Sequence, residues 1–216
     1  MSSFGYRKPA DLPTAIPLFP LAGALVFPRA PLPLNIFEPR YLNMVDDALG
    51  ADRLIGMIQP AKGDDDAPEP ALARVGCVGR ITSFAETEDG RYLITLTGVC
   101  RFTIVREMPL VRPYRQAEVS YDAFAADLKQ PLEQIDRDKL RHALRSYVDS
   151  HGFKADWSAV DDAPSEALVN AVSAACPFDA AAKQALLEAP SLAERCSALI
   201  ALLEWGAGDD TERPLQ

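Results

Sequence analysis

The chain has 216 residues, of which 48% are hydrophobic and 25% are charged, and its formal net charge is −9. This composition is typical of a globular protein with one large domain or two small ones. Its apolar runs are far shorter than the roughly 18 residues of a membrane-spanning helix, and an acidic chain is repelled by nucleic-acid phosphates. We therefore expect no binding to membranes or nucleic acids and, because no signal-peptide pattern opens the chain, a cytoplasmic protein.

The first half of the chain has the short, proline-interrupted apolar runs of β-strands. Asp89-Gly90 separates two of these runs and predicts a hairpin turn, because this dipeptide readily adopts positive φ. In the second strand of the hairpin, Ile94 and Leu96 share one face. The predicted strands cover residues 16–21, 31–37, 54–58, 80–85, 91–97 and 114–121, and one further strand after residue 97 contains Phe102 and Ile104.

A short helix is predicted directly after the second of these strands. Pro39 suits the first helical position because its φ is fixed and it has no N–H to satisfy. Glu38 can place its carboxylate beside the free N–H groups at the helix start. Met44 and Val45 continue the apolar face, and Gly50 ends the helix.

From Phe124 onward the apolar residues recur at the 3.6-residue spacing of helices. We expect four helices: one up to Gly152, one over residues 168–175, one capped by Asp179, and one that begins with a Ser-x-x-Glu capping box at residues 191–194. The sequence therefore predicts an α+β chain, with a β-barrel over residues 12–122 followed by a helical bundle over residues 123–206.

The sequence carries no recognisable catalytic or metal-binding motif. The four cysteines are widely spaced, which favours buried thiols over zinc ligands or disulfides. His142 and His151 lack the spacing of a zinc-binding pair, and the aspartates at residues 64–66 lack the spaced ligands of a calcium loop. Neither a phosphate-binding loop nor a Gly-x-Ser-x-Gly elbow is present. We therefore predict no cofactor, no metal ion and no catalysis.

One candidate for contact with a polypeptide is the proline-rich segment that contains Phe27, Pro28, Arg29 and Leu32. Its apolar residues cannot all face inward, and an exposed apolar ridge would suit unfolded segments of other proteins. The alternative is a stiff loop packed on its own barrel. Loop chemistry does not decide between the two.

A second candidate is the pair Glu38 and Arg40, which could serve as charged anchors for a peptide. The alternative is that the two side chains hold their own fold together by local ion pairing and helix capping. We favour this structural role, because it is the commoner one for such a pair beside a buried strand end.

Several motifs together resemble the amino-terminal substrate-recognition domain of Lon-type ATP-dependent proteases. The most informative is the run Phe37-Glu38-Pro39-Arg40-Tyr41, and further matches lie at residues 16–21, 25–28, 56–58, 76–81, 89–91, 98–102 and 186–195. The resemblance implies a PUA-like β-barrel followed by a C-terminal helical bundle. It also implies a non-catalytic, stand-alone module that binds unfolded polypeptide substrates or a partner protease, without the ATPase and serine-lysine protease modules of Lon.

Two other functions stay open at this point. A small hydrolase or small-molecule-binding protein would use the groove between barrel and helices, and a deep pocket with convergent polar groups would indicate it. An RNA-binding module of the PUA type would need a basic face, and the net charge of −9 does not suggest one. The sequence predicts neither the oligomeric state nor the natural partner.

Overall fold

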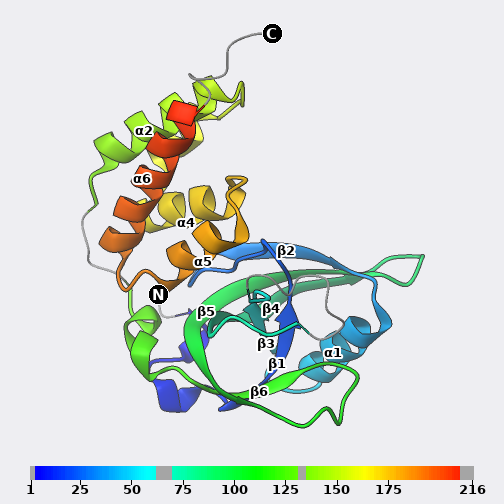
Figure 1. Ribbon diagram of the computed structural model, residues 1–216. Helices are drawn as coiled ribbons and strands as arrows, with labels where there is room; N and C mark the ends of the chain where they lie inside the picture. Colours follow the sequence, from blue (N-terminus) through cyan, green and yellow to red (C-terminus); the bar gives the residue numbers. More distant parts are fainter. Residues whose placement is uncertain (1–2, 62–69, 131–134, 210–216) are drawn as a thin grey trace. The chain divides into compact units, whose positions relative to one another are not determined.

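The computed structural model describes residues 3–61, 70–130 and 135–209. The chain divides into two compact units (Figure 1). The β unit comprises residues 1–130 with 179–181, and the helical unit comprises residues 131–178 with 182–216. A six-stranded sheet lies in the first unit and α-helices make up most of the second, so the α+β prediction is confirmed.

Each predicted strand has a counterpart in the structure. The strands are β1 (Ala15–Pro20), β2 (Pro31–Ile36), β3 (Leu54–Ile58), β4 (Val75–Glu86), β5 (Tyr92–Glu107) and β6 (Gln116–Ser120). Strands β4 and β5 are longer than predicted. Both faces of β4 are buried near its start, so this part lacks the apolar–polar alternation by which the sequence reveals a strand.

The strand order shows a sheet that closes on itself. The order is β2-β5-β4-β3-β1-β6, and β5 also pairs with β6, which closes a ring of five strands. Figure 1 shows the long β5 curving around this unit, with β2 on its outer side. β1 runs parallel to β3, and the other pairings are antiparallel. The predicted Asp89-Gly90 turn joins β4 to β5, with Gly90 at φ 76°.

The interior of the β unit is filled around Phe102 of β5, which is fully buried. Two glycines make room for its ring: a Cβ on Gly76 would lie 2.5 Å from the ring carbon Cζ, and one on Gly56 would lie 3.1 Å from Cε1. The surrounding core includes Leu12, Ile16, Leu18, Leu54, Ile58, Val78, Val99, Cys100, Ala117, Val119 and Tyr121.

The segment after β6 differs from the prediction of one helical stripe that begins at Leu128 and continues up to Gly152. Residues 122–128 form a 3-10 helix, η3 (Asp122–Leu128), whose Leu128 belongs to the core of the β unit. The next helix, α2 (Arg137–Ser150), begins later. The continuous stripe is therefore wrong, because apolar residues of η3 pack against strands rather than extend the helical face.

Helix α1 (Pro39–Leu49) confirms the prediction from Pro39 and Gly50. Its buried face carries Met44, Val45 and Ala48, together with Tyr41. The ring of Tyr41 lies 4.3 Å from the ring of Phe19 of β1, measured between centroids. This aromatic contact fixes the helix start against the sheet.

The helical unit contains α2, α3 (Trp157–Asp162), α4 (Ser165–Ala175), most of α5 (Ala180–Glu188) and α6 (Leu192–Asp209). One half of the predicted capping box is observed, since Ser191 Oγ accepts a hydrogen bond from the Glu194 N–H at 3.2 Å, while the Ser191 hydroxyl donates to Glu194 Oε2 at 2.9 Å. Buried Arg195 donates to the Leu186 carbonyl and to Asn170 Oδ1, each at 2.9 Å, and so connects α4, α5 and α6. Helix α3 was not predicted.

Candidate binding site

Phe27 and Pro28, predicted as candidates for an exposed ridge, are both buried. Phe27 has 0% of its surface exposed. Its backbone crosses Gly98 so closely that a Cβ there would lie 2.0 Å from the Phe27 carbonyl oxygen. Arg29 has φ 65° and donates its N–H to the Gly98 carbonyl at 2.8 Å, which turns the chain back into β2. An exposed ridge at these two residues is thus wrong, and the packed loop is the observed alternative.

Arg29 and Leu32, the other two residues of this candidate, are half-buried. The guanidinium of Arg29 donates to the backbone carbonyl of Asp127 in η3. Leu32 of β2 pairs with Leu96 of β5. Both residues therefore have structural contacts, and their role in binding a polypeptide stays a prediction.

The Arg29 contact is part of a buried polar network that attaches η3 to the strands. Arg101 is only 3% exposed and forms a two-pronged ion pair with Asp127, with Nε–Oδ2 and NH2–Oδ1 distances of 2.8 Å. Asp127 also accepts the backbone N–H of Arg101 at 3.0 Å, and the guanidinium lies 4.4 Å from the ring centroid of Phe124. Such a satisfied buried pair stabilises one arrangement of the scaffold and presents no group to a ligand.

Glu38 and Arg40 lie at the surface and pair with each other. The distance from Arg40 NH2 to Glu38 Oε2 is 2.8 Å, and the guanidinium lies 4.5 Å from the ring centroid of Tyr41. Glu38 occupies the N-cap position of α1, but its side chain makes no capping hydrogen bond. The predicted capping contact is therefore wrong and the predicted local ion pair is confirmed, because the carboxylate turns toward the guanidinium.

The β unit also exposes an apolar loop that sequence reasoning missed. Leu110 is 60% exposed and Val111 is 84% exposed, in the connection from β5 to β6. The sequence could have indicated this loop, because residues 108–111 are four consecutive apolar residues between two strands. In such a run the side chains cannot all face the core, so some of them are exposed. The loop is therefore a surface contact candidate.

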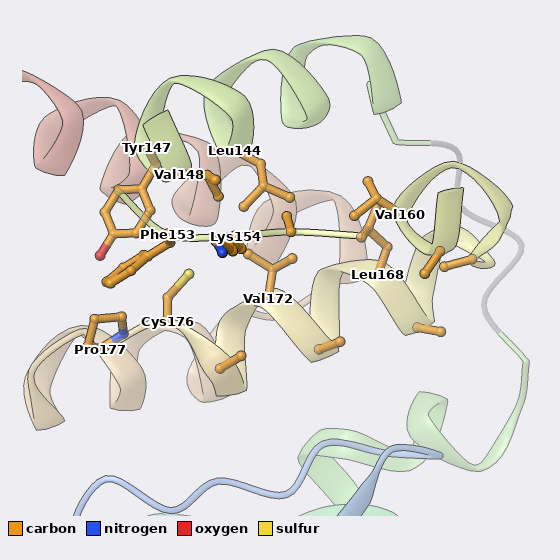
Figure 2. A pocket seen from close by; sticks show the side chains of 16 residues that line it. Leu144, Tyr147, Val148, Phe153, Lys154, Val160, Leu168, Val172, Cys176 and Pro177 are labelled. Carbon is orange, nitrogen blue, oxygen red and sulfur yellow. The ribbon is translucent and has the colours of Figure 1, made fainter. Parts of the chain in front are cut away.

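A concave, mostly apolar site lies within the helical unit. It is a cavity of about 710 Å³ between α2, α3, α4 and the loop after α2. In Figure 2 the labelled side chains of α2 and α4 point toward each other across this space. The lining residues are Leu144, Tyr147, Val148, Phe153, Lys154, Ala155, Ala159, Val160, Ala163, Ala167, Leu168, Ala171, Val172, Ala175, Cys176 and Pro177.

One wall of the space is made of small side chains. Ala167, Ala171 and Ala175 recur every fourth residue along α4, so they lie on one face of that helix, and Ala163 precedes it in the chain. These three alanines of α4 are exposed, so this wall is open to solvent. This alanine periodicity was the signal in the sequence that could have indicated the cavity.

Few polar groups reach the cavity, and burial keeps two of them neutral. Of its lining residues, Tyr147, Lys154 and Cys176 carry the polar side-chain atoms. Burial raises the pKa of the Tyr147 hydroxyl, and it raises the pKa of the Cys176 thiol to about 11, although Lys183 opposes this shift. At neutral pH the cavity thus presents an uncharged thiol and phenol, neither of which is an activated nucleophile.

Among the described residues, no group of three histidine, cysteine, aspartate or glutamate side chains is arranged to hold a metal ion. Likewise, none of the helices in residues 3–61, 70–130 and 135–209 combines the length and hydropathy needed to cross a membrane. The predicted acidic loop at residues 64–66 lies outside the described residues.

Comparison with known proteins gives consistent matches. The family described as ATP-dependent protease La (LON) substrate-binding domain matches residues 15–204. A Lon protease 2 of Sorangium cellulosum is 28% identical over 134 residues, which cover 56% of this chain and 16% of that protein. The chain therefore spans a small part of the length of this relative.

Two solved structures share the fold. A Lon N-terminal domain protein from Xanthomonas campestris has a TM-score of 0.60 at 23% identity and covers 87% of this chain and 98% of its own. The N-terminal domain of a Lon protease from the Mycobacterium avium complex has a TM-score of 0.63 at 16% identity, with 88% and 97% covered.

Proposed function

This chain belongs to the family of Lon substrate-binding domains, and from this premise we propose that it binds exposed apolar segments of unfolded polypeptides in the cavity of its helical unit. The resemblance predicted from the sequence motifs is thereby confirmed. We further propose that the module binds without catalysing a reaction. A partner protease could receive the bound polypeptide or itself be a ligand.

The observation that carries the proposal is the apolar lining of the cavity. A volume of about 710 Å³ accommodates several aliphatic or aromatic side chains of a polypeptide segment. Removing such side chains from water is favourable by about 25 cal/mol for each Å² of apolar surface. Because this attraction is non-directional, it suits ligands that share apolar character but no common sequence.

The same lining argues against the alternative of a small hydrolase. A reacting centre needs an activated nucleophile or a group poised for proton transfer, whereas burial raises the pKa of the Tyr147 hydroxyl and of the Cys176 thiol, and apart from these two and Lys154 the lining is apolar. The groove between barrel and helices, which the sequence offered as a site for that alternative, stays a prediction.

The test is the affinity for a reduced, alkylated and fluorescently labelled unfolded protein, measured by anisotropy. In the variant Ala171→Glu the helix-forming tendency is retained but a carboxylate enters the cavity wall. We expect binding to weaken at least about tenfold, because the charge must be desolvated when an apolar segment enters.

The matched control is Ser146→Glu, which adds the same charge at an exposed position of α2 outside the lining. Its affinity should stay within about twofold of the unmodified protein. Equal losses in the two variants would show that net charge alone weakens binding. Unchanged binding in Ala171→Glu would exclude the cavity as the site.

A further inference from the structure

One wall of the cavity is formed by a helix that has little to stabilise it. Helix α3 has six residues, and none of them is buried. Helices this short are not stable in isolation, since nucleation is unfavourable and most helical stability in proteins comes from packing. Ala159 and Val160 of α3, and Ala163 directly after it, line the cavity.

Helix α3 is attached to α2 mainly through three arginines. Arg137, Arg141 and Arg145 are spaced four residues apart and so lie along one face of α2. Arg137 donates to the carbonyl oxygens of Val160 at 3.1 Å and of Ala163 at 2.8 Å. Because the last carbonyls of a helix have no partner within it, this guanidinium satisfies the C-terminal end of α3.

The other two arginines contact side chains of α3. Arg141 forms a two-pronged ion pair with Asp161, with distances of 2.7 Å from Nε to Oδ1 and 3.1 Å from NH2 to Oδ2. Arg145 lies 4.6 Å from the ring centroid of Trp157. These groups are solvent-accessible, so each contact contributes little compared with burial of an apolar side chain.

The chain on either side of α3 permits it to move as a unit. Gly152 follows the end of α2 with φ 63°, a conformation that glycine adopts without strain. At the other end, Ala163 and Pro164 have extended backbones between α3 and α4. A rotation about these two connections would lift α3 without disturbing the packing of α2 on α6.

We propose that α3 is a movable wall of the cavity, which Arg137, Arg141 and Arg145 hold against α2 and which opens to admit an apolar polypeptide segment. This inference rests on the proposed function for its ligand. Opening exchanges polar contacts that are exposed at Arg141 and part-buried at Arg137 for contacts with water, and it exposes no fully buried side chain of α3, so it costs less than unfolding of the helical unit. The arginine face thereby sets how readily the cavity accepts a ligand.

Hydrogen exchange of the intact chain tests the motion without any ligand. In the unmodified protein, the amides of α3 should exchange much faster than those of α4. Arg141→Ala should accelerate exchange in α3 by about two- to fivefold, as expected for loss of one exposed ion pair, and Arg137→Ala should do so by at least about tenfold. Arg137 also donates to Ser165 Oγ at the first residue of α4, at 3.3 Å, so the comparison uses the amides of α4 beyond its first turn, whose exchange should not change in either variant.

A double-mutant cycle shows whether the ion pair itself is responsible. Asp161→Ala should reproduce the effect of Arg141→Ala, and the double variant should add little, because both substitutions remove one interaction. Arg106→Ala, which breaks an exposed pair with Glu118 in the β unit, is the matched control and should leave α3 unchanged. Equally slow exchange in α3 and α4, or unchanged α3 exchange in Arg137→Ala, would overturn the proposal.

The labelled unfolded protein then separates this inference from the proposed function. Faster association with Arg141→Ala than with the unmodified chain is the expected result. If the labelled protein fails to bind any variant while α3 still exchanges as described, the proposed function is wrong and the movable wall stands. If it binds at the same rate to every arginine variant, the wall does not control entry.

Discussion

The β unit and the helical unit use their apolar residues differently. In the β unit the large aromatic residues Phe27 and Phe102 are fully buried, and even the charged pair Arg101 and Asp127 lies inside. In the helical unit one face of α4 is lined by alanines, and a cavity of about 710 Å³ is left beside it. A filled core favours one conformation, whereas an apolar cavity retains surface that a ligand can still cover.

This difference indicates a division of roles. The residues predicted as contacts in the β unit prove to be largely parts of its scaffold, since Phe27, Pro28 and Arg29 all contact the unit's own chain. The helical unit, which the sequence predicted only as a bundle, contains the cavity that we propose as the binding site. Substitutions should therefore affect stability most in the first unit and binding most in the second.

The largest effect is expected for Phe27→Ala. Removing a fully buried ring should lower the free energy of unfolding by about 3–5 kcal/mol, measured by denaturant titration. Phe37→Ala is the matched control, because the Phe37 side chain is 62% exposed, and it should change stability by less than about 0.5 kcal/mol. Equal effects of the two substitutions would contradict the burial of Phe27.

Asp127→Ala should lower the free energy of unfolding nearly as much as Phe27→Ala. It leaves the guanidinium of Arg101 buried without its carboxylate, which typically lowers the unfolding free energy by about 3–5 kcal/mol. The remaining contact with the ring of Phe124 offsets a small part of this. Glu118→Ala, which breaks the exposed pair with Arg106, should cost no more than about 1 kcal/mol. A cost this small for Asp127→Ala would show that the pair is not buried.

Adding the same volume to each unit sharpens the comparison further. Ala117→Leu inserts three carbons into the filled core of the β unit and should destabilise by about 1–3 kcal/mol. Ala171→Leu places the same group in the cavity, where space exists, and should change stability by less than about 1 kcal/mol. Thermal unfolding of the two variants tests this directly, and similar losses would mean that the cavity is not open space.

The smallest effect is expected for Glu38→Ala. Because the carboxylate pairs with exposed Arg40 and does not cap α1, its removal should lower the unfolding free energy by less than about 0.5 kcal/mol. A true capping residue would cost about 1 kcal/mol. Denaturant titration at low and high salt distinguishes a surface ion pair from a capping residue. For an ion pair, the loss of unfolding free energy caused by Glu38→Ala should disappear at high salt, because salt screens the pair.

Local chemistry made the elements predictable, and long-range packing made the site difficult to predict. The helix of residues 39–49 followed from Pro39 and Gly50, and the hairpin followed from Asp89-Gly90. The burial of Phe27 could not be predicted, because it depends on the close approach of Gly98, which is distant in sequence. Helix α3 escaped prediction because it is short and, apart from the N-cap Asp156, its contacts come from arginines of another helix.

The central claim is that a polypeptide binds in the helical unit rather than on the β unit. The most direct test is hydrogen exchange across the whole chain with and without a saturating unfolded protein. We predict slower exchange in the loop after α2 and along α3 and α4, with no change in residues 27–40 or in the loop at residues 108–111. Protection confined to those segments of the β unit, with the cavity elements unaffected, would contradict the account.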